Sequence, residues 1–271
     1  MAADRDAAPG VWDGHLLLLH ATERERRTGV GSWVRRGLEL GEKVIYAEAP
    51  AASAESLVAV LAADGIDAET ALRDGRLAML PLEEFYPPEG QHAPIQRSLA
   101  EGFSAVRMSV DVDAALQWLL PSTYPAIERG VEEMVRTLPV SVMCQYSRSA
   151  TTGPGLDAIV ADHLTGVRQA SFGTSPNSHG LVLHGELDVS NRDVIDAVVS
   201  AAVAGVGKVL TLDLADVAFL DVDSGRRLEG LSRDFRAAGG LLRLLAPRPN
   251  VERVLRLVKV DERAGISLAV A

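Results

Sequence analysis

The chain has 271 residues, of which 47% are apolar and 24% charged, and its formal net charge at pH 7 is −10. This composition supports a packed core and excludes a globally disordered chain. Nucleic acid is a poor match for an acidic protein, and a single cysteine excludes a disulfide within the chain. No apolar run reaches the roughly 18 residues of a membrane span, and the acidic start lacks a signal-peptide core. We therefore expect a cytoplasmic protein without a membrane segment.

Strand and helix patterns alternate through the first 168 residues, after an expected flexible tail over 1–10. The expected strands are 15–20, 43–47, 75–80, 105–110 and 140–146. The expected helices are 23–40, 55–64 and 122–137, the last with Glu128, Glu132 and Glu133 on its water-exposed side. Residues 81–102 are polar and rich in proline, and we expect a long loop there. This alternation is typical of a mainly parallel α/β sheet.

A second domain is expected to follow a break in the pattern. Residues 169–178 are small, polar and interrupted by Gly and Pro, which indicates an interdomain linker. The chain thus divides into expected domains over 11–168 and 179–271. Expected strands in the second domain are 180–184, 208–213, 241–245 and 266–270, and expected helices are 191–204, 224–238 and 250–258. This order predicts a smaller α/β domain.

The charge is unevenly distributed along the chain. Residues 1–170 carry a net charge of −9 and residues 171–271 a net charge of −1. Within the second part, residues 171–225 carry −6 and residues 226–271 carry +5. The positive C-terminal segment predicts a basic face that could dock on an acidic surface.

Few residues form patterns with a specific chemistry. The segment Gly205–Lys208 lacks the first glycine and the final Ser or Thr of a phosphate-binding P-loop, so it indicates a turn. Cys144 lies in an apolar strand, where a buried, unreactive thiol is expected. No Cys or His spacing is typical of a metal site, and we expect neither a metal nor a cofactor.

Two Asp-Val-Asp segments, at 111–113 and 221–223, follow or end strands. Paired carboxylates of this kind could bind Mg²⁺, or they could cap a helix. The second pair belongs to a candidate switch segment made of Asp221, Val222, Asp223 and Ser224. Because this segment begins a helix, Ser224 is either a helix cap or a site where a phosphoryl group would be stabilised by the helix dipole.

Residues 179–271 resemble the STAS family of anti-sigma-factor antagonists. The resemblance rests on the segments Leu183–Asp188, Val209–Asp213, Val217–Asp221, Ser224–Gly225 and Ala246–Leu255. It implies a domain that binds an anti-sigma factor or serine-kinase-like protein. It also implies control by phosphorylation of a Ser or Thr directly after the Asp that ends the strand. Here Val222 follows Asp221, so Ser224 comes two residues late, or Asp223 takes the place of the acceptor.

Residues 11–168 resemble the MEDS sensory domain, which is related in fold to the RecA and KaiC ATPases. The resemblance rests on His15, Gly37–Tyr46, Arg107, Glu128 and Val142–Tyr146. It implies binding of a small molecule, and because the chain has no P-loop it does not imply nucleotide hydrolysis. His15, Arg107 and Tyr146 are the candidate ligand-binding residues that the resemblance supplies.

Together the two resemblances predict a signalling protein that is not an enzyme. Its sensory domain would control the binding of a protein partner by the STAS domain, and thereby transcription. One alternative is a scaffold of a signalling complex that senses nothing. Another is an enzyme that uses Asp111, Asp113 and His15 for acid–base chemistry at the strand ends of the first domain. The sequence leaves the ligand, the sigma pathway and the oligomeric state open.

Overall fold

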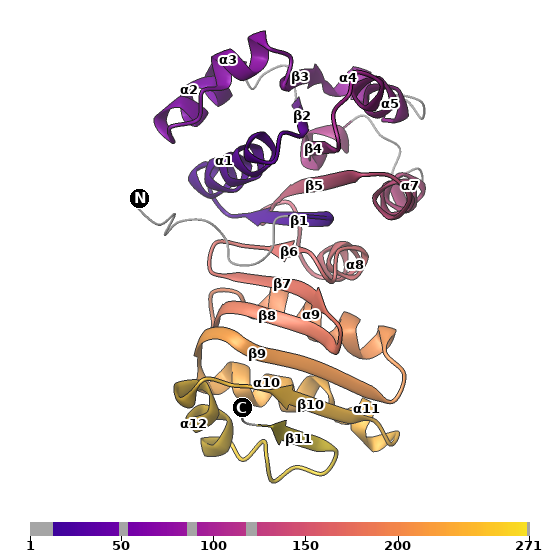
Figure 1. Cartoon of the computed structure of the whole chain (residues 1–271). Coiled ribbons are helices and arrows are strands. Elements are labelled where there is room, and N and C mark those ends of the chain that lie inside the picture. Colours follow the sequence, from indigo (N-terminus) through magenta and orange to yellow (C-terminus); the bar gives the residue numbers. More distant parts are fainter. Residues whose placement is uncertain (1–12, 49–53, 86–90, 118–123, 270–271) are drawn as a thin grey trace. The chain divides into compact units, whose positions relative to one another are not determined.

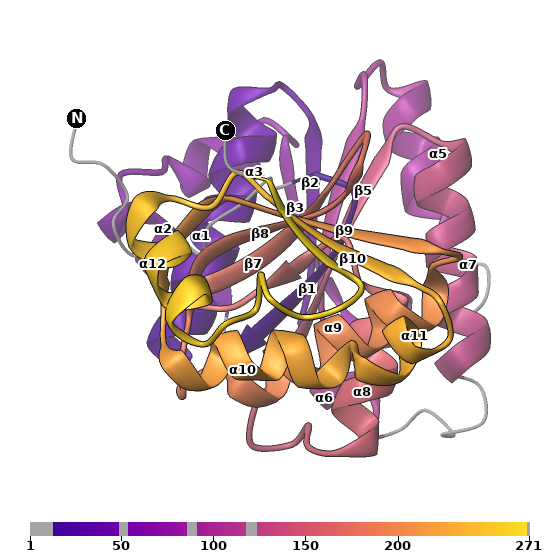
Figure 2. The ribbon, with the colours of Figure 1, turned by 90° about the horizontal axis from the view of Figure 1, so that it is seen from below.

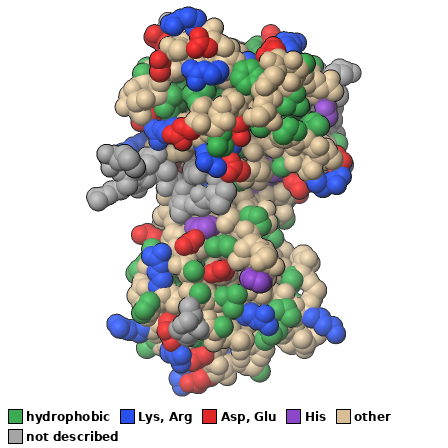
Figure 3. All heavy atoms as spheres, viewed as in Figure 1, with side chains coloured by type: hydrophobic (Ala, Val, Ile, Leu, Met, Phe, Trp, Pro, Cys, Tyr) green, Lys and Arg blue, Asp and Glu red, His purple; other side chains and the backbone are tan. Residues whose placement is uncertain are grey.

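The computed structural model describes residues 13–48, 54–85, 91–117 and 124–269, so the expected tail over 1–10 lies outside the described residues. These residues form two compact units that divide between Ala150 and Thr151 (Figure 1). We call them the N-terminal unit and the C-terminal unit. Within the described residues, no helix combines the length and the apolar character needed to cross a membrane. On the face shown in Figure 3, acidic and basic side chains are intermixed over the N-terminal unit.

The N-terminal unit is a parallel sheet with helices on both faces. Its strands are β1 (His15–His20), β2 (Lys43–Glu48), β3 (Leu77–Pro81), β4 (Val106–Asp111) and β5 (Val140–Ser147). Its helices are α1 (Glu23–Glu39), α2 (Ala54–Ala63), α3 (Ala68–Arg73), α4 (Leu82–Phe85), α5 (His92–Ala100), α6 (Val112–Ala115) and α7 (Tyr124–Thr137). The strands lie in the order β1-β5-β4-β2-β3. Helices α1, α2 and α3 lie on one side of the sheet, and α5 and α7 on the other (Figure 2).

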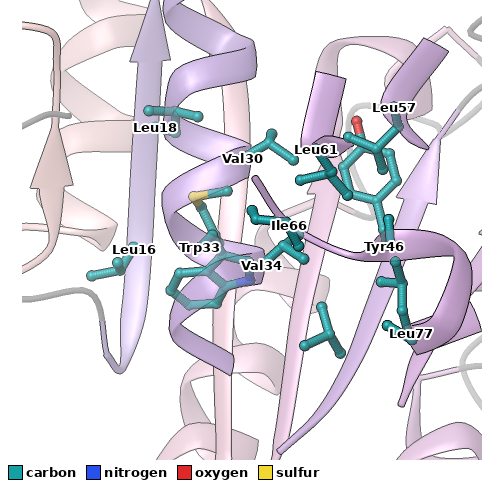
Figure 4. Close-up of a cluster of buried hydrophobic side chains, with 14 residues drawn as sticks. Leu16, Leu18, Val30, Trp33, Val34, Tyr46, Leu57, Leu61, Ile66 and Leu77 are labelled. Carbon is teal, nitrogen blue, oxygen red and sulfur yellow. The ribbon is translucent and has the colours of Figure 1, made fainter. Parts of the chain in front are cut away.

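Helix α1 begins where the sequence supplies a reciprocal cap. The Thr22 hydroxyl accepts a hydrogen bond from the Glu25 N–H at 3.2 Å, and the Glu25 carboxylate accepts one from the Ala21 N–H at 2.8 Å. This satisfies donors that a helix start otherwise leaves unpaired. Trp33 and Val30 then pack with strand residues in a buried apolar cluster between α1, α2 and the sheet (Figure 4).

A buried cation lies under α1 at the start of β4. The Arg107 side chain is fully buried, and its Nε and Nη2 donate hydrogen bonds to Glu42 and Asp13, each at 2.6 Å. Its guanidinium group lies 4.3 Å from the centroid of the Trp33 ring, within the range of a cation–π interaction. Glu42 directly precedes β2, and Asp13 precedes β1 with one residue between them. Arg107 therefore ties three strands and α1 together.

Gly37 allows α1 to approach this cation. A Cβ atom at Gly37 would lie 2.6 Å from Cγ2 of Val44 and 3.0 Å from Cδ of Arg107.

The charge around Arg107 is also balanced. Burial alone would raise the pKa of Asp13, but hydrogen bonds and Coulombic attraction from Arg107 and Arg36 lower it below its ordinary value. Asp13 is therefore ionised, as the buried guanidinium requires.

The C-terminal unit is a mixed sheet. Its strands are β6 (Val167–Arg168), β7 (Phe172–Asn177), β8 (Gly180–Leu187), β9 (Val209–Leu220), β10 (Leu241–Leu245) and β11 (Ile266–Ala269). Its helices are α8 (Pro154–Asp162), α9 (Arg192–Gly205), α10 (Val222–Leu231), α11 (Arg233–Ala237) and α12 (Pro249–Leu257). The strands follow one another in chain order, antiparallel from β6 to β8 and parallel from β8 to β11. Helices α9 and α10 lie side by side on one face (Figure 2), joined by an ion pair between Arg227 and Asp196.

Three of the expected segments have another structure, and the division between Ala150 and Thr151 comes before the expected domain end at 168. The expected linker over 169–178 contains β7, in which Phe172 and Thr174 are fully buried. This segment lacks apolar alternation, and it forms a strand because its backbone pairs with β8. The expected loop over 81–102 holds α4 and α5, and α5 tolerates Pro94 because it stands in the first turn. The expected helix over 224–238 divides at Ser232, whose hydroxyl donates to the Leu228 carbonyl at 2.9 Å.

We expect replacement of Arg107 by Met to lower the free energy of unfolding of the N-terminal unit by about 3 kcal/mol, because it leaves two carboxylates without their buried partner. All three tryptophans (Trp12, Trp33 and Trp118) precede residue 150, so tryptophan fluorescence in a urea titration reports on this unit. Arg136→Met is the control, because Arg136 pairs with Glu133 at the surface, where water screens the charges and we expect no measurable loss of stability. Equal losses in the two variants would contradict the role of Arg107.

Candidate functional site

A polar cluster lies on the sheet face that α7 covers, at strands β1 and β5. In the parallel register His15 stands beside Val142, and Leu19 beside Tyr146. Because alternate residues of a strand share a face, Cys144 and Tyr146 point to the same side as His15. Glu128 of α7 completes the cluster. Glu128, Cys144 and Tyr146 are at most 5% exposed as whole residues.

The imidazole of His15 lies at the centre of this cluster. Its Nε2 atom is 3.4 Å from Oε2 of Glu128 and 3.7 Å from Sγ of Cys144. Its Nδ1 atom is 3.2 Å from Oε2 of Glu132, one turn further along α7. The Tyr146 hydroxyl donates to Oε1 of Glu128 at 3.5 Å. The two nitrogens of one ring thus face two different carboxylates.

Three of these side chains offer atoms that bind metal ions in proteins. One ligand atom each of His15, Glu128 and Cys144 lies within 4.8 Å of the others. Imidazole, carboxylate and thiolate are the usual ligands of zinc. Burial, and after it the negative charge of Glu128, raises the pKa of the Cys144 thiol well above its ordinary value. Without a metal this thiol is therefore protonated and unreactive at neutral pH.

Arg107, the third candidate ligand-binding residue, lies on the opposite face of the sheet. It contacts Trp33 of α1, whereas His15 and Tyr146 contact Glu128 of α7. Its guanidinium group is engaged by two carboxylates at the amino ends of the strands. The structure therefore brings two of the three candidates together and separates Arg107 from them.

The structure corrects the expected exposure of Glu128, whose side chain is buried and faces β1 and β5. Glu132 and Glu133 of the same helix are exposed, as expected. The spacing of apolar residues in α7 indicates that Glu128 is buried. Glu128 precedes the buried Val131 by three residues, and Met134 follows after three more, so the carboxylate belongs to the apolar stripe of α7.

The residues of the enzyme alternative do not form one site. Asp111 accepts a hydrogen bond from the Ala114 N–H at 3.0 Å and so caps α6, while Asp113 accepts one from the Ser147 N–H at 2.5 Å. Burial raises the pKa of Asp113. His15 of β1 and Met108 of β4 both pair with Val142 of the intervening strand β5. Met108 comes three residues before Asp111 on β4. Both carboxylates are thus engaged by the backbone, at a distance along the strands from His15.

The switch segment 221–224 begins α10. The N-cap is Asp221, whose Oδ1 accepts a hydrogen bond from the Ser224 N–H at 2.6 Å. Ser224 is only 2% exposed, whereas Val222 is 37% exposed. Asp223 forms an ion pair with Arg192 at 3.0 Å. Asp221, and not Ser224, therefore caps α10, and the Ser224 hydroxyl is buried.

Exposed apolar side chains lie in and next to this segment, at the carboxyl ends of two neighbouring strands. Strands β8 and β9 are parallel neighbours, with Leu187 beside Leu220, so their carboxyl ends lie at the same edge. Val189, Phe219 and Val222, at these ends, are 68%, 47% and 37% exposed. We call these three residues the strand-end patch. Figure 3 shows that hydrophobic side chains reach the surface of this unit on the face drawn there.

A separate cavity of about 390 Å³ opens between β2, β3 and α5. Its lining mixes charged and apolar side chains, among them Lys43, Arg97, Glu84, Ile45 and Leu80. None of these residues forms a recognisable sequence pattern, since they meet only through the sheet order.

The comparison with protein families decides what this fold is. The model of the MEDS domain (MEthanogen/methylotroph, DcmR Sensory domain) matches residues 14–164. The chain belongs to the MEDS family. The STAS domain model matches residues 175–271, so a MEDS domain is followed by a STAS domain. The resemblances and the α/β fold class predicted from the sequence are confirmed. A sensory domain joined to a STAS domain indicates a signalling protein.

Solved structures resemble both parts of the MEDS–STAS chain. The anti-sigma factor antagonist SpoIIAA in its unphosphorylated form is 23% identical over 36% of this chain and 88% of its own, with a TM-score of 0.30. A KaiC-like protein from Pyrococcus horikoshii is 14% identical over 68% of this chain and 84% of its own, with a TM-score of 0.46. The comparison with curated proteins finds no match.

The burial of Ser224 gives a prediction about phosphorylation. When the chain is incubated with ATP and a serine kinase that acts on STAS domains, we expect Ser224 to stay unmodified, because its hydroxyl is buried. We expect Val222→Ser to accept phosphate, because that position is exposed, directly follows the capping Asp221 and stands at a helix start. Mass spectrometry of the peptide around 221–225 measures both, with Val222→Ala as the control. Full phosphorylation of Ser224 in the unaltered chain would contradict the prediction.

Proposed function

We propose that the STAS domain binds an anti-sigma factor of the serine-kinase type, and that a small molecule bound by the MEDS domain changes the affinity of this binding. The control is a coupling free energy between the two binding events. The protein thereby regulates transcription without itself being an enzyme. In support of the last point, Asp111 and Asp113, the carboxylates of the enzyme alternative, are engaged by backbone N–H groups.

The strand-end patch is the observation that carries this proposal. Exposed apolar side chains that gather at one place mark surfaces for protein partners. Phe219 is a large aromatic side chain that is half exposed, and aromatic residues of this kind dominate binding energy at interfaces. The pair Arg192–Asp223 supplies charges beside it, which would orient a partner.

Phosphorylation is not the control that we propose. The exposed position after Asp221 is Val222, which has no hydroxyl, and the Ser224 hydroxyl is buried. Asp223 keeps a fixed negative charge near the helix start, held by Arg192. Partner binding would then be set by the sensory ligand.

The patch is tested with the full chain and purified anti-sigma serine kinases of the source organism, by titration calorimetry. We expect Phe219→Glu to weaken binding about 30-fold or more, since a central aromatic residue contributes about 2 kcal/mol. Val209→Glu is the matched control, because Val209 is exposed on the same strand at its other end. Binding that Phe219→Glu leaves unchanged would refute the patch as the docking surface.

Sensory control is tested separately. Compounds are first screened for those that raise the unfolding temperature of the MEDS domain, and tryptophan fluorescence measures this unfolding. We expect such a compound to change the partner Kd by about 5- to 150-fold. A compound that stabilises the MEDS domain but leaves the partner Kd unchanged would favour the scaffold alternative, even if the STAS domain binds its partner.

A further inference from the structure

The His15 cluster contains three groups that carry lone pairs and converge on one point. Imidazole Nε2, a Glu128 oxygen and the Cys144 sulfur face one another. The separation of 3.4 Å between Nε2 and Oε2 exceeds the 2.7–3.2 Å usual for an N–H···O hydrogen bond. Without a metal, the Cys144 S–H can donate to His15 Nε2 at 3.7 Å, and a cation that replaces this proton would be bound by all three groups.

Two of the three separations between these atoms match those of a tetrahedral metal site, and the third, between Cys144 Sγ and a Glu128 oxygen, is within 4.8 Å. Zinc binds sulfur at about 2.3 Å and nitrogen or oxygen at about 2.0–2.1 Å, so tetrahedral angles place sulfur and nitrogen about 3.6 Å apart and nitrogen and oxygen about 3.3 Å apart. The observed separations are 3.7 Å for Cys144 Sγ to His15 Nε2, and 3.4 Å for His15 Nε2 to Glu128 Oε2. Small movements of side chains would admit an ion.

The surrounding residues orient the ligands as they do in known metal sites. Metal-bound histidines place their second ring nitrogen against a carboxylate or carbonyl, which fixes the tautomer and the ring. His15 Nδ1 lies 3.2 Å from Glu132, so a neutral ring that donates its Nδ1–H to Glu132 presents the lone pair of Nε2 to Glu128 and Cys144. The Tyr146 hydroxyl holds Oε1 of Glu128, which leaves Oε2 turned to His15.

We propose that His15 Nε2, Glu128 Oε2 and Cys144 Sγ bind one divalent cation of the zinc class in the MEDS domain. Sulfur and nitrogen ligands together favour Zn²⁺ over Mg²⁺ or Ca²⁺, which prefer oxygen. On binding, the Cys144 S–H bond breaks, the proton leaves to solvent, and sulfur bonds to the metal. The fourth position of the tetrahedron belongs to water or to another ligand. Glu132 acts as a positioning residue through His15.

The test uses the full chain without an affinity tag, stripped of metal and titrated with Zn²⁺ and with Co²⁺. We expect one ion per chain and, with Co²⁺, a thiolate-to-metal charge-transfer band in the near ultraviolet. Because the chain has one cysteine, this band reports on Cys144 alone. Cys144→Ser should abolish the band, and His15→Gln and Glu128→Gln should lower the affinity at least 100-fold. His184→Gln is the matched control, a buried histidine of the STAS domain that should change nothing.

Glu132→Gln keeps the test decisive if a buried variant fails to fold, because the Glu132 side chain is 64% exposed. We expect it to weaken metal binding about 10- to 100-fold while the charge-transfer band is kept. Failure of the unaltered chain to bind Zn²⁺, a Co²⁺ complex without the thiolate band, or full affinity in His15→Gln would each overturn the proposal. Metal binding is measured directly, so the result does not depend on whether the STAS domain binds the proposed partner.

Discussion

The buried guanidinium group of Arg107 is the interaction on which the packing of the MEDS domain depends. A buried cation is expensive, and the cost is offset only because carboxylates from the segments before β1 and β2 both reach it. This requirement brings the starts of three strands together. It also draws α1 close to the sheet, where Trp33 covers the cation and Gly37 leaves room for it.

The alternation of side chains along β4 and its neighbours then separates two faces with different properties. The face with Arg107 is closed by α1 and filled with large apolar side chains, so it stabilises the fold. The opposite face, under α7, carries His15, Cys144 and Tyr146 in one register, and a single carboxylate from the helix serves two of them. The His15 cluster therefore lies on the face of the sheet opposite the buried cation.

Much of this arrangement follows from local sequence patterns, and the rest depends on contacts between distant residues. Most strands and α1 could be predicted because their apolar periodicity is local. The site could be predicted only in part, because His15 and Tyr146 share a face while Arg107 does not. Glu128 was expected in water, since a carboxylate on an apolar stripe becomes favourable only when a partner such as His15 lies opposite. Strand β7 was missed because its stability comes from pairing with β8.

Under the proposed function, the buried hydroxyl of Ser224 has a consequence for the timing of the response. A covalent mark outlasts the stimulus that wrote it, and erasing it requires a second protein. A STAS domain whose output depends only on reversible occupancy keeps no such record. Its response ends as soon as the sensed molecule dissociates, and each cycle consumes no nucleotide. Such a chain would report the present concentration of its ligand, with a delay set by dissociation rates alone.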